Sequence, residues 1–148
     1  MFQNVVGQLA TASKLAALTD ESGNEIRIWQ SAATFVGRGV ETVGYVITAS
    51  QASRCKIEYP EDGQPPFKGE CTVMRKELRG FTAATLLEPL LPYANTEMGC
   101  GVVDGVWYDM DIVHNGKRFV ISASNPDSCT DDGSNSVSAL IEAVYRLK

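Results

Sequence analysis

The stretch that decides the fold is residues 107–124, which read WYDMDIVHNGKRFVISAS. Two runs of alternating apolar and polar residues flank Asn115-Gly116, and Asn-Gly in that setting is the strongest short-range signal for a β-hairpin. A two-residue turn at this point pairs residues whose numbers sum to 231, so that Met110 lies opposite Ile121. Both strands then place their apolar side chains on one face. The sequence therefore predicts an antiparallel hairpin with one face in the core.

Further strands and helices are expected on both sides of this hairpin in the chain. Apolar residues recur at helical spacing in the first segment and in the last, which predicts helices over residues 2–16 and 136–147. A third helical segment, residues 81–93, contains Pro89 and Pro92, which limit it to one or two turns unless Pro89 lies in the first turn. Alternating patterns predict four strands before the hairpin, at residues 26–29, 41–50, 54–59 and 71–75.

These elements predict a fold of the α+β class. We expect an antiparallel sheet of about five or six strands with the helices, the N- and C-terminal ones included, packed on one face. A chain of 148 residues without a linker, repeat or low-complexity tract is expected to form a single α+β domain over residues 1–148.

The four cysteines are expected to form two disulfides. None belongs to a C-x-x-C pair, which argues against a thiolate metal site or a thioredoxin-type redox site. The hairpin register brings Cys100 and Cys129 to the base of the hairpin, and Cys55 and Cys71 lie on two neighbouring predicted strands. We therefore expect the bridges Cys55–Cys71 and Cys100–Cys129, with four reduced, buried cysteines as the alternative.

Composition and charge narrow the classes of partner. The chain has 18 acidic and 13 basic residues, a net charge of -5 and a pI near 4.8, which argues against a nucleic-acid partner. No run of about 20 apolar residues is present, so we expect no membrane insertion. The net charge is concentrated in residues 97–135, where acidic side chains outnumber Lys117 and Arg118, and such a region favours association with a basic partner.

The second face of the hairpin carries the candidate binding residues. Asp109 and Asp111 are two residues apart on one strand, so their carboxylates are expected on one face about 7 Å apart. Such a pair has three possible roles. It keeps an open sheet face solvated, it contacts a partner, or it acts as an acid–base pair or a cation ligand. The candidate partner-binding residues are Trp107, Asp109, Asp111, Asp127, Asp131 and Asp132.

Other residues with possible chemistry have plainer interpretations. His114 is the single histidine and is expected in solvent at the corner of the turn, which leaves no Ser-His-Asp set and no histidine metal site. Residues 127–135 resemble a calcium loop in composition but match no EF-hand register, so a loop with a helix N-cap is expected. Trp29 and Trp107 fall on outward faces of their strands, where a helix or loop covers them or a partner does. We therefore predict no catalytic residues, no metal and no cofactor.

Three functional hypotheses remain. The first is a non-enzymatic protein-binding module, an inhibitor or immunity-type protein, that binds a basic partner such as an enzyme or toxin through residues 97–135. The alternative is a small carboxylate-dependent hydrolase that uses Asp109 and Asp111. A second alternative is a structural or assembly subunit of an envelope or particle, which would expose a large apolar patch.

Disulfides favour an exported location. Bridges of this kind persist in the periplasm or outside the cell. Residues 1–8 lack the basic start of a signal peptide, so a periplasmic or secreted protein requires a leader that is absent from this sequence. A cytoplasmic location is the alternative.

Overall fold

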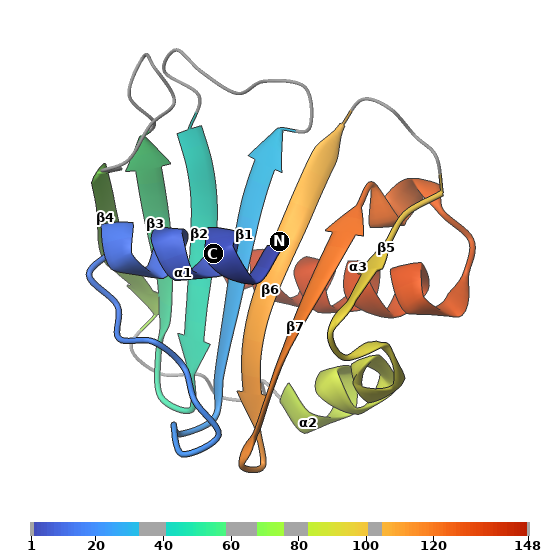
Figure 1. Ribbon diagram of the computed structural model, residues 1–148, viewed down its shortest axis with the longest axis horizontal. Coiled ribbons are helices and arrows are strands. Elements are labelled where there is room, and N and C mark those ends of the chain that lie inside the picture. Colours follow the sequence, from blue (N-terminus) through green and yellow to red (C-terminus); the bar gives the residue numbers. More distant parts are fainter. Residues whose placement is uncertain (1, 33–40, 59–67, 76–82, 101–104, 148) are drawn as a thin grey trace.

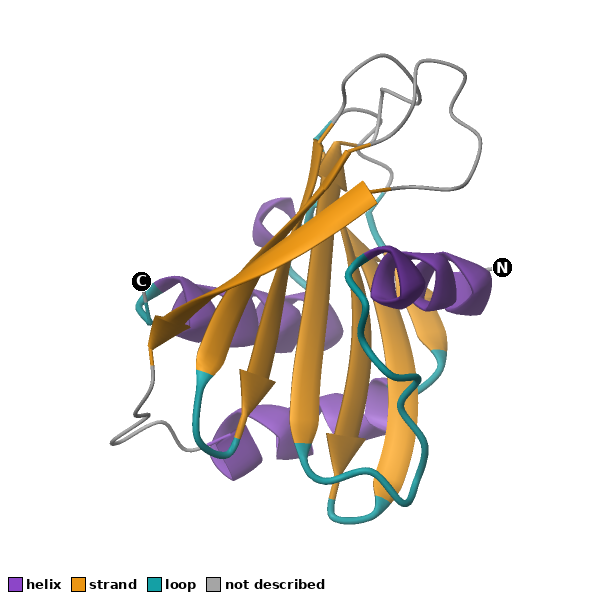
Figure 2. Ribbon diagram, turned by 90° about the vertical axis from the view of Figure 1, so that its left-hand side faces the viewer, coloured by secondary structure: helices purple, strands orange, loops and turns teal. Residues whose placement is uncertain are grey.

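The sheet is built outward from the hairpin, and its two faces are both covered by helices (Figures 1 and 2). The computed structural model describes residues 2–32, 41–58, 68–75, 83–100 and 105–147. The helices of this part are α1 (Phe2–Ala12), α2 (Ala83–Leu87) and α3 (Asp132–Tyr145), with 3-10 segments η1 (Glu88–Tyr93) and η2 (Pro126–Ser128). The strands are β1 (Glu25–Ala32), β2 (Glu41–Thr48), β3 (Ala52–Glu58), β4 (Lys68–Arg75), β5 (Thr96–Met98), β6 (Val106–His114) and β7 (Lys117–Ser124).

The hairpin of β6 and β7 has the expected register. Pairs run from Trp107 opposite Ser124 to His114 opposite Lys117. Asn115 and Gly116 both have positive φ, 52° and 75°, as the turn between such strands requires. The prediction from residues 107–124 is confirmed.

The α+β class is confirmed, but the sheet is larger than expected and mixed. In the described part of the chain it has seven strands in the order β4-β3-β2-β1-β6-β7-β5, and every neighbouring pair is antiparallel except β5 and β7, which are parallel. The additional strand, β5, is three residues long and lies at an edge. So short a segment carries no alternation that a sequence pattern could reveal.

The expectation that the helices pack on one face is wrong. One face carries α2, η1 and α3, and the other carries α1, which crosses the sheet from β6 at its N-terminal end to β4 near Ala12 (Figures 1 and 2). Ala12 approaches β4 closely because Gly69 has no side chain: a Cβ there would lie 2.7 Å from the Ala12 carbonyl oxygen. The sheet is therefore the middle layer of three.

Two apolar clusters hold these layers together. The larger lies between the sheet and α2, η1 and α3, and it includes Met110, Ile112 and Ile121 of the hairpin together with Leu140 of α3. The smaller lies under α1 and contains Leu9, Trp29, Val46, Cys55, Ile57 and Val120. The side chains of β6 and β7 that were expected to face solvent lie on this second, covered face.

The helix boundaries differ from the expected ones. The first helix ends at Ala12 instead of residue 16, and the last begins at Asp132 instead of residue 136. The segment expected to be helical over residues 81–93 is α2 followed by η1, in which Pro89 and Pro92 remove backbone donors that an α-helix would need. Residues 81 and 82 lie outside the described part of the chain.

Both predicted disulfides are present, Cys55–Cys71 and Cys100–Cys129. Cys55 and Cys71 face each other directly across β3 and β4. The second bridge joins the segment after β5 to the segment between η2 and α3, with the two Cα atoms 5.7 Å apart. Within the described residues, no helix is long and apolar enough to cross a membrane.

Candidate functional site

Asp109 and Asp111 are buried, so the expectation that this face of the hairpin is open to solvent is wrong. Their exposed fractions are 8% and 4%. Alternation places both side chains on the sheet face that α1 covers, together with Trp29 and Val120. Neither carboxylate forms part of an exposed acidic surface, and contact with a partner remains a prediction for them.

Asp111 is held by a two-point ion pair. Arg118 Nε donates to one carboxylate oxygen at 2.9 Å, and Arg118 Nη2 approaches the other at 3.3 Å. Asp111 is on β6 and Arg118 on β7, and the tight turn between these strands brings the side chains together. Since two-point arginine–carboxylate pairs are the strong ones, Asp111 is engaged structurally and is not free to act with Asp109.

Asp109 has a different environment, although it lies only two residues away. Its cross-strand neighbours are Trp29 on β1 and Ser122 on β7. Burial raises the pKa of the Asp109 carboxyl, the negative charge of Glu97 on β5 raises it further, and a hydrogen bond from Ser122 opposes both effects. Asp109 therefore keeps its proton to a higher pH than an exposed aspartate does.

The structure covers Trp29, as the expectation of a covering helix or loop had it, and it buries the histidine against expectation. Trp29 is 1% exposed and lies against Gly44, where a Cβ would be 2.3 Å from the indole ring. Trp107 is half-buried. His114 is 7% exposed, so the expectation of a solvated turn histidine is wrong.

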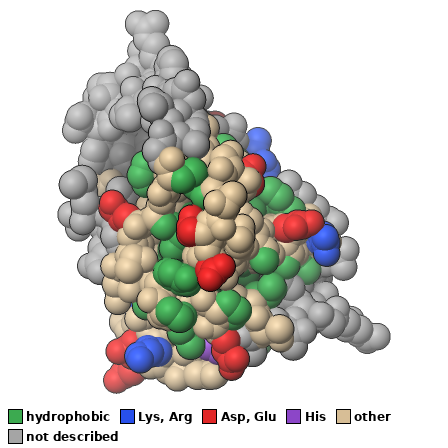
Figure 3. Space-filling view, turned by 90° about the vertical axis from the view of Figure 1, so that its right-hand side faces the viewer, with side chains coloured by type: hydrophobic (Ala, Val, Ile, Leu, Met, Phe, Trp, Pro, Cys, Tyr) green, Lys and Arg blue, Asp and Glu red, His purple; other side chains and the backbone are tan. Residues whose placement is uncertain are grey.

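The remaining candidate residues, Asp127, Asp131 and Asp132, are exposed. They lie in and after η2, at the start of α3, and exposed Glu97 lies on the edge strand β5 at the same side of the molecule. Figure 3 shows this side: acidic side chains lie among hydrophobic ones, and the basic side chains visible there lie toward its margins. We call Glu97, Asp127, Asp131 and Asp132 the acidic side.

Asp131 has a structural role within the acidic side. It is the N-cap of α3, as expected for this loop: its carboxylate accepts the Ser134 backbone N–H at 2.9 Å and the Ser134 hydroxyl at 2.8 Å. These hydrogen bonds, the backbone one first, hold the pKa of Asp131 below its usual value. Asp127 and Asp132 are the exposed acids of this segment that do not cap the helix.

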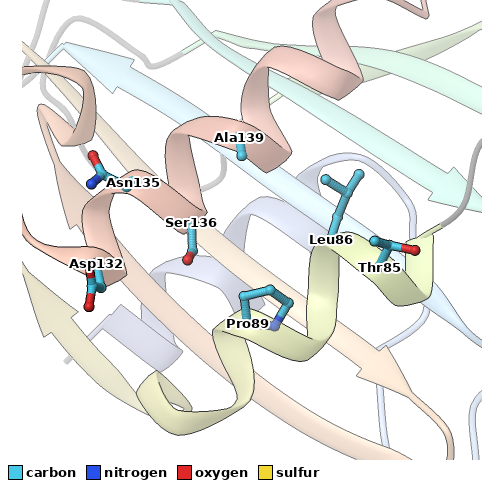
Figure 4. A pocket seen from close by; sticks show the side chains of 7 residues that line it. All are labelled: Thr85, Leu86, Pro89, Asp132, Asn135, Ser136 and Ala139. Carbon is cyan, nitrogen blue, oxygen red and sulfur yellow. The ribbon is translucent and has the colours of Figure 1, made fainter.

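A groove borders the acidic side, between α3 and the α2–η1 segment, with a volume of about 360 Å³. Figure 4 shows that its chemistry changes along its length: the Asp132 carboxylate lies at one end, and Leu86 and Ala139 lie toward the other. Sequence reasoning missed the groove because the packing of η1 on α3, where the Tyr93 ring meets Gly133, leaves no local pattern in the sequence. The lining side chains are Thr85, Leu86, Pro89, Asp132, Asn135, Ser136 and Ala139.

Within the described residues, no group of three or more His, Cys, Asp or Glu side chains is arranged to hold a metal ion. Comparison with known proteins gave no assignment: the chain matches no protein-family model, and no curated protein is significantly similar to it. The function proposed below therefore depends on the geometry and charge of this chain.

Proposed function

We propose that this protein is a non-enzymatic binding module, an inhibitor or immunity-type protein, that binds a basic protein partner through the acidic side. The observation that carries the proposal is the groove with Asp132 at one end and aliphatic side chains at the other. A lysine or arginine side chain has the matching form, an aliphatic stem with a cationic head. We propose that such a side chain of the partner lies in this groove.

The surrounding charge supports the same partner. Asp127 and Glu97 are exposed on the acidic side, and clustered charge of one sign speeds the association of an oppositely charged protein. Leu91 of η1 is 38% exposed and adds an apolar contact. Relative to the expectation from the sequence, the proposed surface moves from the hairpin face to Asp127, Asp131 and Asp132, with Glu97.

The test compares charge variants in capture from an extract of the native host. We expect Asp127→Asn/Asp132→Asn to lose a basic protein that the wild-type chain retains, and Ala139→Arg to lose it by filling the groove. Glu21→Gln/Glu70→Gln is the matched control, since both residues are exposed and lie outside the acidic side and the groove. Equal capture by the wild type and by both test variants would refute the proposed surface.

The hydrolase remains a second candidate because the Asp109 carboxyl is buried, which raises its pKa, and because it interacts electrostatically with Glu97 of β5. The partner carboxylate would then be Glu97 instead of Asp111, which is bound to Arg118. Hydrolysis of a broad panel of ester, glycoside and phosphate substrates that Asp109→Asn abolishes would support this candidate. An assembly subunit has less support, because Val73 and Leu91 are the large hydrophobic residues found exposed among those whose side-chain burial the structure describes.

We also propose a periplasmic or secreted location, supported by the two disulfides. Protein taken from its native compartment, denatured and alkylated without reduction, is expected to have no free thiol. Four free thiols in that material would favour the cytoplasm.

A further inference from the structure

A second cavity lies on the α1 side of the sheet, away from the acidic side. Its volume is about 380 Å³. The chain between α1 and β1, which crosses in front of the sheet in Figure 1, forms one wall with residues 16–18 and 22–24. The end of β2 and the turn after it, residues 48–50, form another, and Glu25 and Arg27 of β1 complete the lining.

Arg27 is the unusual member of this lining. It is 3% exposed, and its Nε donates to the Glu25 carboxylate two residues earlier on the same strand. Its Nη1 is buried and has no hydrogen-bond partner in the part of the chain that the structure describes. A buried donor on a charged group that is left unpaired costs more than an ordinary unpaired donor. Among the described residues, the site therefore lacks an acceptor for Nη1 of Arg27.

The other charged groups around Arg27 do not supply this acceptor. Asp111 is the direct neighbour of Arg27 on β6, but its two oxygens lie on Arg118. Asp20 accepts the backbone N–H of Arg118. Glu25 faces the cavity and engages Nε only, and its side chain is 19% exposed. None of these three carboxylates accepts a hydrogen bond from Nη1, so another group has to supply the acceptor.

The walls indicate the rest of the ligand. Ala16, Ala17 and Leu18 present an aliphatic surface, while Ser22 and Asn24 are polar. A mostly apolar cavity with a few convergent polar groups is the usual form of a small-molecule site. The guanidinium in its lining favours a carboxylate, which matches the planar fork of arginine.

We propose that this cavity binds a small organic acid, with its carboxylate on Arg27 and its short aliphatic chain against Ala16, Ala17 and Leu18. Glu25 competes with the ligand for the same guanidinium. This makes the charge at position 25 a sensitive test: Glu25→Gln keeps an acceptor for Nε and removes the competing negative charge.

Sodium butyrate is the probe, with sodium chloride at equal ionic strength and butyramide as controls. Titration is followed by NMR through the Arg27 side-chain N–H and the methyl groups of Ala16, Ala17 and Leu18. We expect saturable shifts with butyrate in the wild type and none with chloride. We expect Arg27→Gln to weaken binding about tenfold or more, as loss of a charge-assisted hydrogen bond predicts, and Glu25→Gln to tighten it.

Two variants keep the test valid if Arg27→Gln fails to fold. Ala17→Leu fills the cavity from an exposed position without touching Arg27, and we expect it to weaken butyrate binding. Arg54→Gln is the matched control, since Arg54 is a partly buried arginine outside the cavity, and it is expected to bind butyrate as the wild type does. Absence of saturable shifts in the wild type, equal binding of butyramide, or unchanged binding by Ala17→Leu would overturn the proposal.

Discussion

Two aspartates on one strand illustrate how neighbouring residues of one type acquire different chemistry. Asp111 has a cation on both carboxylate oxygens, whereas Asp109 has a serine hydroxyl and a nearby glutamate. Arg118 pairs with the carboxylate of Asp111. Burial raises the pKa of Asp109, the charge of Glu97 raises it further, and the hydrogen bond from Ser122 opposes both effects. Both side chains lie on the same face of β6 and both are buried, so the side chains contributed by β5 and β7 distinguish their surroundings.

The raised pKa of Asp109 predicts a loss of stability with rising pH. Between the unfolded and the folded pKa, the unfolded chain holds fewer protons than the folded chain, so the free energy of unfolding falls as pH rises through that interval. Asp109→Asn removes this fall, and we expect it to be at least as stable as the wild type at neutral pH. Urea unfolding over a pH series measures the effect.

Asp111→Asn is the contrasting variant, because it removes the charge that pairs with Arg118. We expect it to lower the free energy of unfolding by about 1.5–3 kcal/mol. A steeper pH dependence in Asp109→Asn than in the wild type would contradict the environment assigned to Asp109.

Gly44 is required by packing. A Cβ at this position would meet two carbons of the Trp29 ring at 2.3 Å, and Trp29 is enclosed under α1. We expect Gly44→Ala to lower the free energy of unfolding by about 1–3 kcal/mol, as overpacked core positions do. Urea unfolding of this variant beside Gly23→Ala is the measurement, since a Cβ on Gly23 meets nothing within 4 Å. Equal stability of the two variants would contradict the packing of Trp29 on Gly44.

At the scale of elements, the sequence was most informative where a local signal fixed the geometry. Asn115-Gly116 specified both the turn and the register, and every residue pair of the hairpin followed from it. The Cys100–Cys129 and Cys55–Cys71 bridges followed from strand pairing. The start of α3 at Asp132 was placed too late because the helix begins with polar residues, which carry no apolar periodicity.

The short elements could not be predicted, because long-range contacts define them. β5 is three residues of edge strand that pair in parallel with β7. The η1 segment depends on two prolines and on packing against α3. The groove at Asp132 lies between these elements, so the part of the candidate site that η1 and α3 form together was not visible in either segment alone.

The contribution of α1 can be tested through Leu9, which is 2% exposed and packs in the cluster under the helix. We expect Leu9→Ala to lower the free energy of unfolding by about 2–5 kcal/mol, the range for leucine truncation in a core. Gln8→Ala, at the neighbouring exposed position, is expected to change it by less than about 0.5 kcal/mol. Chemical unfolding provides both values, and a Leu9→Ala chain as stable as Gln8→Ala would show that α1 does not hold that face.

At the scale of the whole molecule, helices cover both faces of the sheet, and for that reason the predicted binding residues Asp109 and Asp111 on the hairpin are buried. The sequence placed Trp29, Trp107 and Val120 on the face opposite the main core, and three large apolar side chains on one face are an indication that something covers it. The predicted N-terminal helix was available for that role. The prediction placed this helix on the same face as the C-terminal helix, so Asp109 and Asp111 were expected to be exposed. The structure buries both residues.

The two disulfides lie at different distances along the sheet from the proposed binding surface. Cys55–Cys71 joins the strands at the β4 edge, remote in the sheet order from β5, and closes a loop of 16 residues. Cys100–Cys129 closes a loop of 29 residues and fixes the segment that carries Asp127, Asp131 and Asp132. By loop entropy, removal of the bridges costs about 3 and about 3.5 kcal/mol respectively.

We therefore expect Cys55→Ala/Cys71→Ala and Cys100→Ala/Cys129→Ala to lose similar stability in urea unfolding. Their affinities for the partner should differ. Only Cys100→Ala/Cys129→Ala removes the bridge that fixes the segment of the acidic side, and ordering that segment on association then costs free energy. Capture of the basic partner, measured at a temperature where both variants are folded, is expected to weaken for the Cys100→Ala/Cys129→Ala chain alone. Equal capture by both variants would place the partner surface elsewhere, because a surface ordered by the Cys100–Cys129 bridge must respond to its loss.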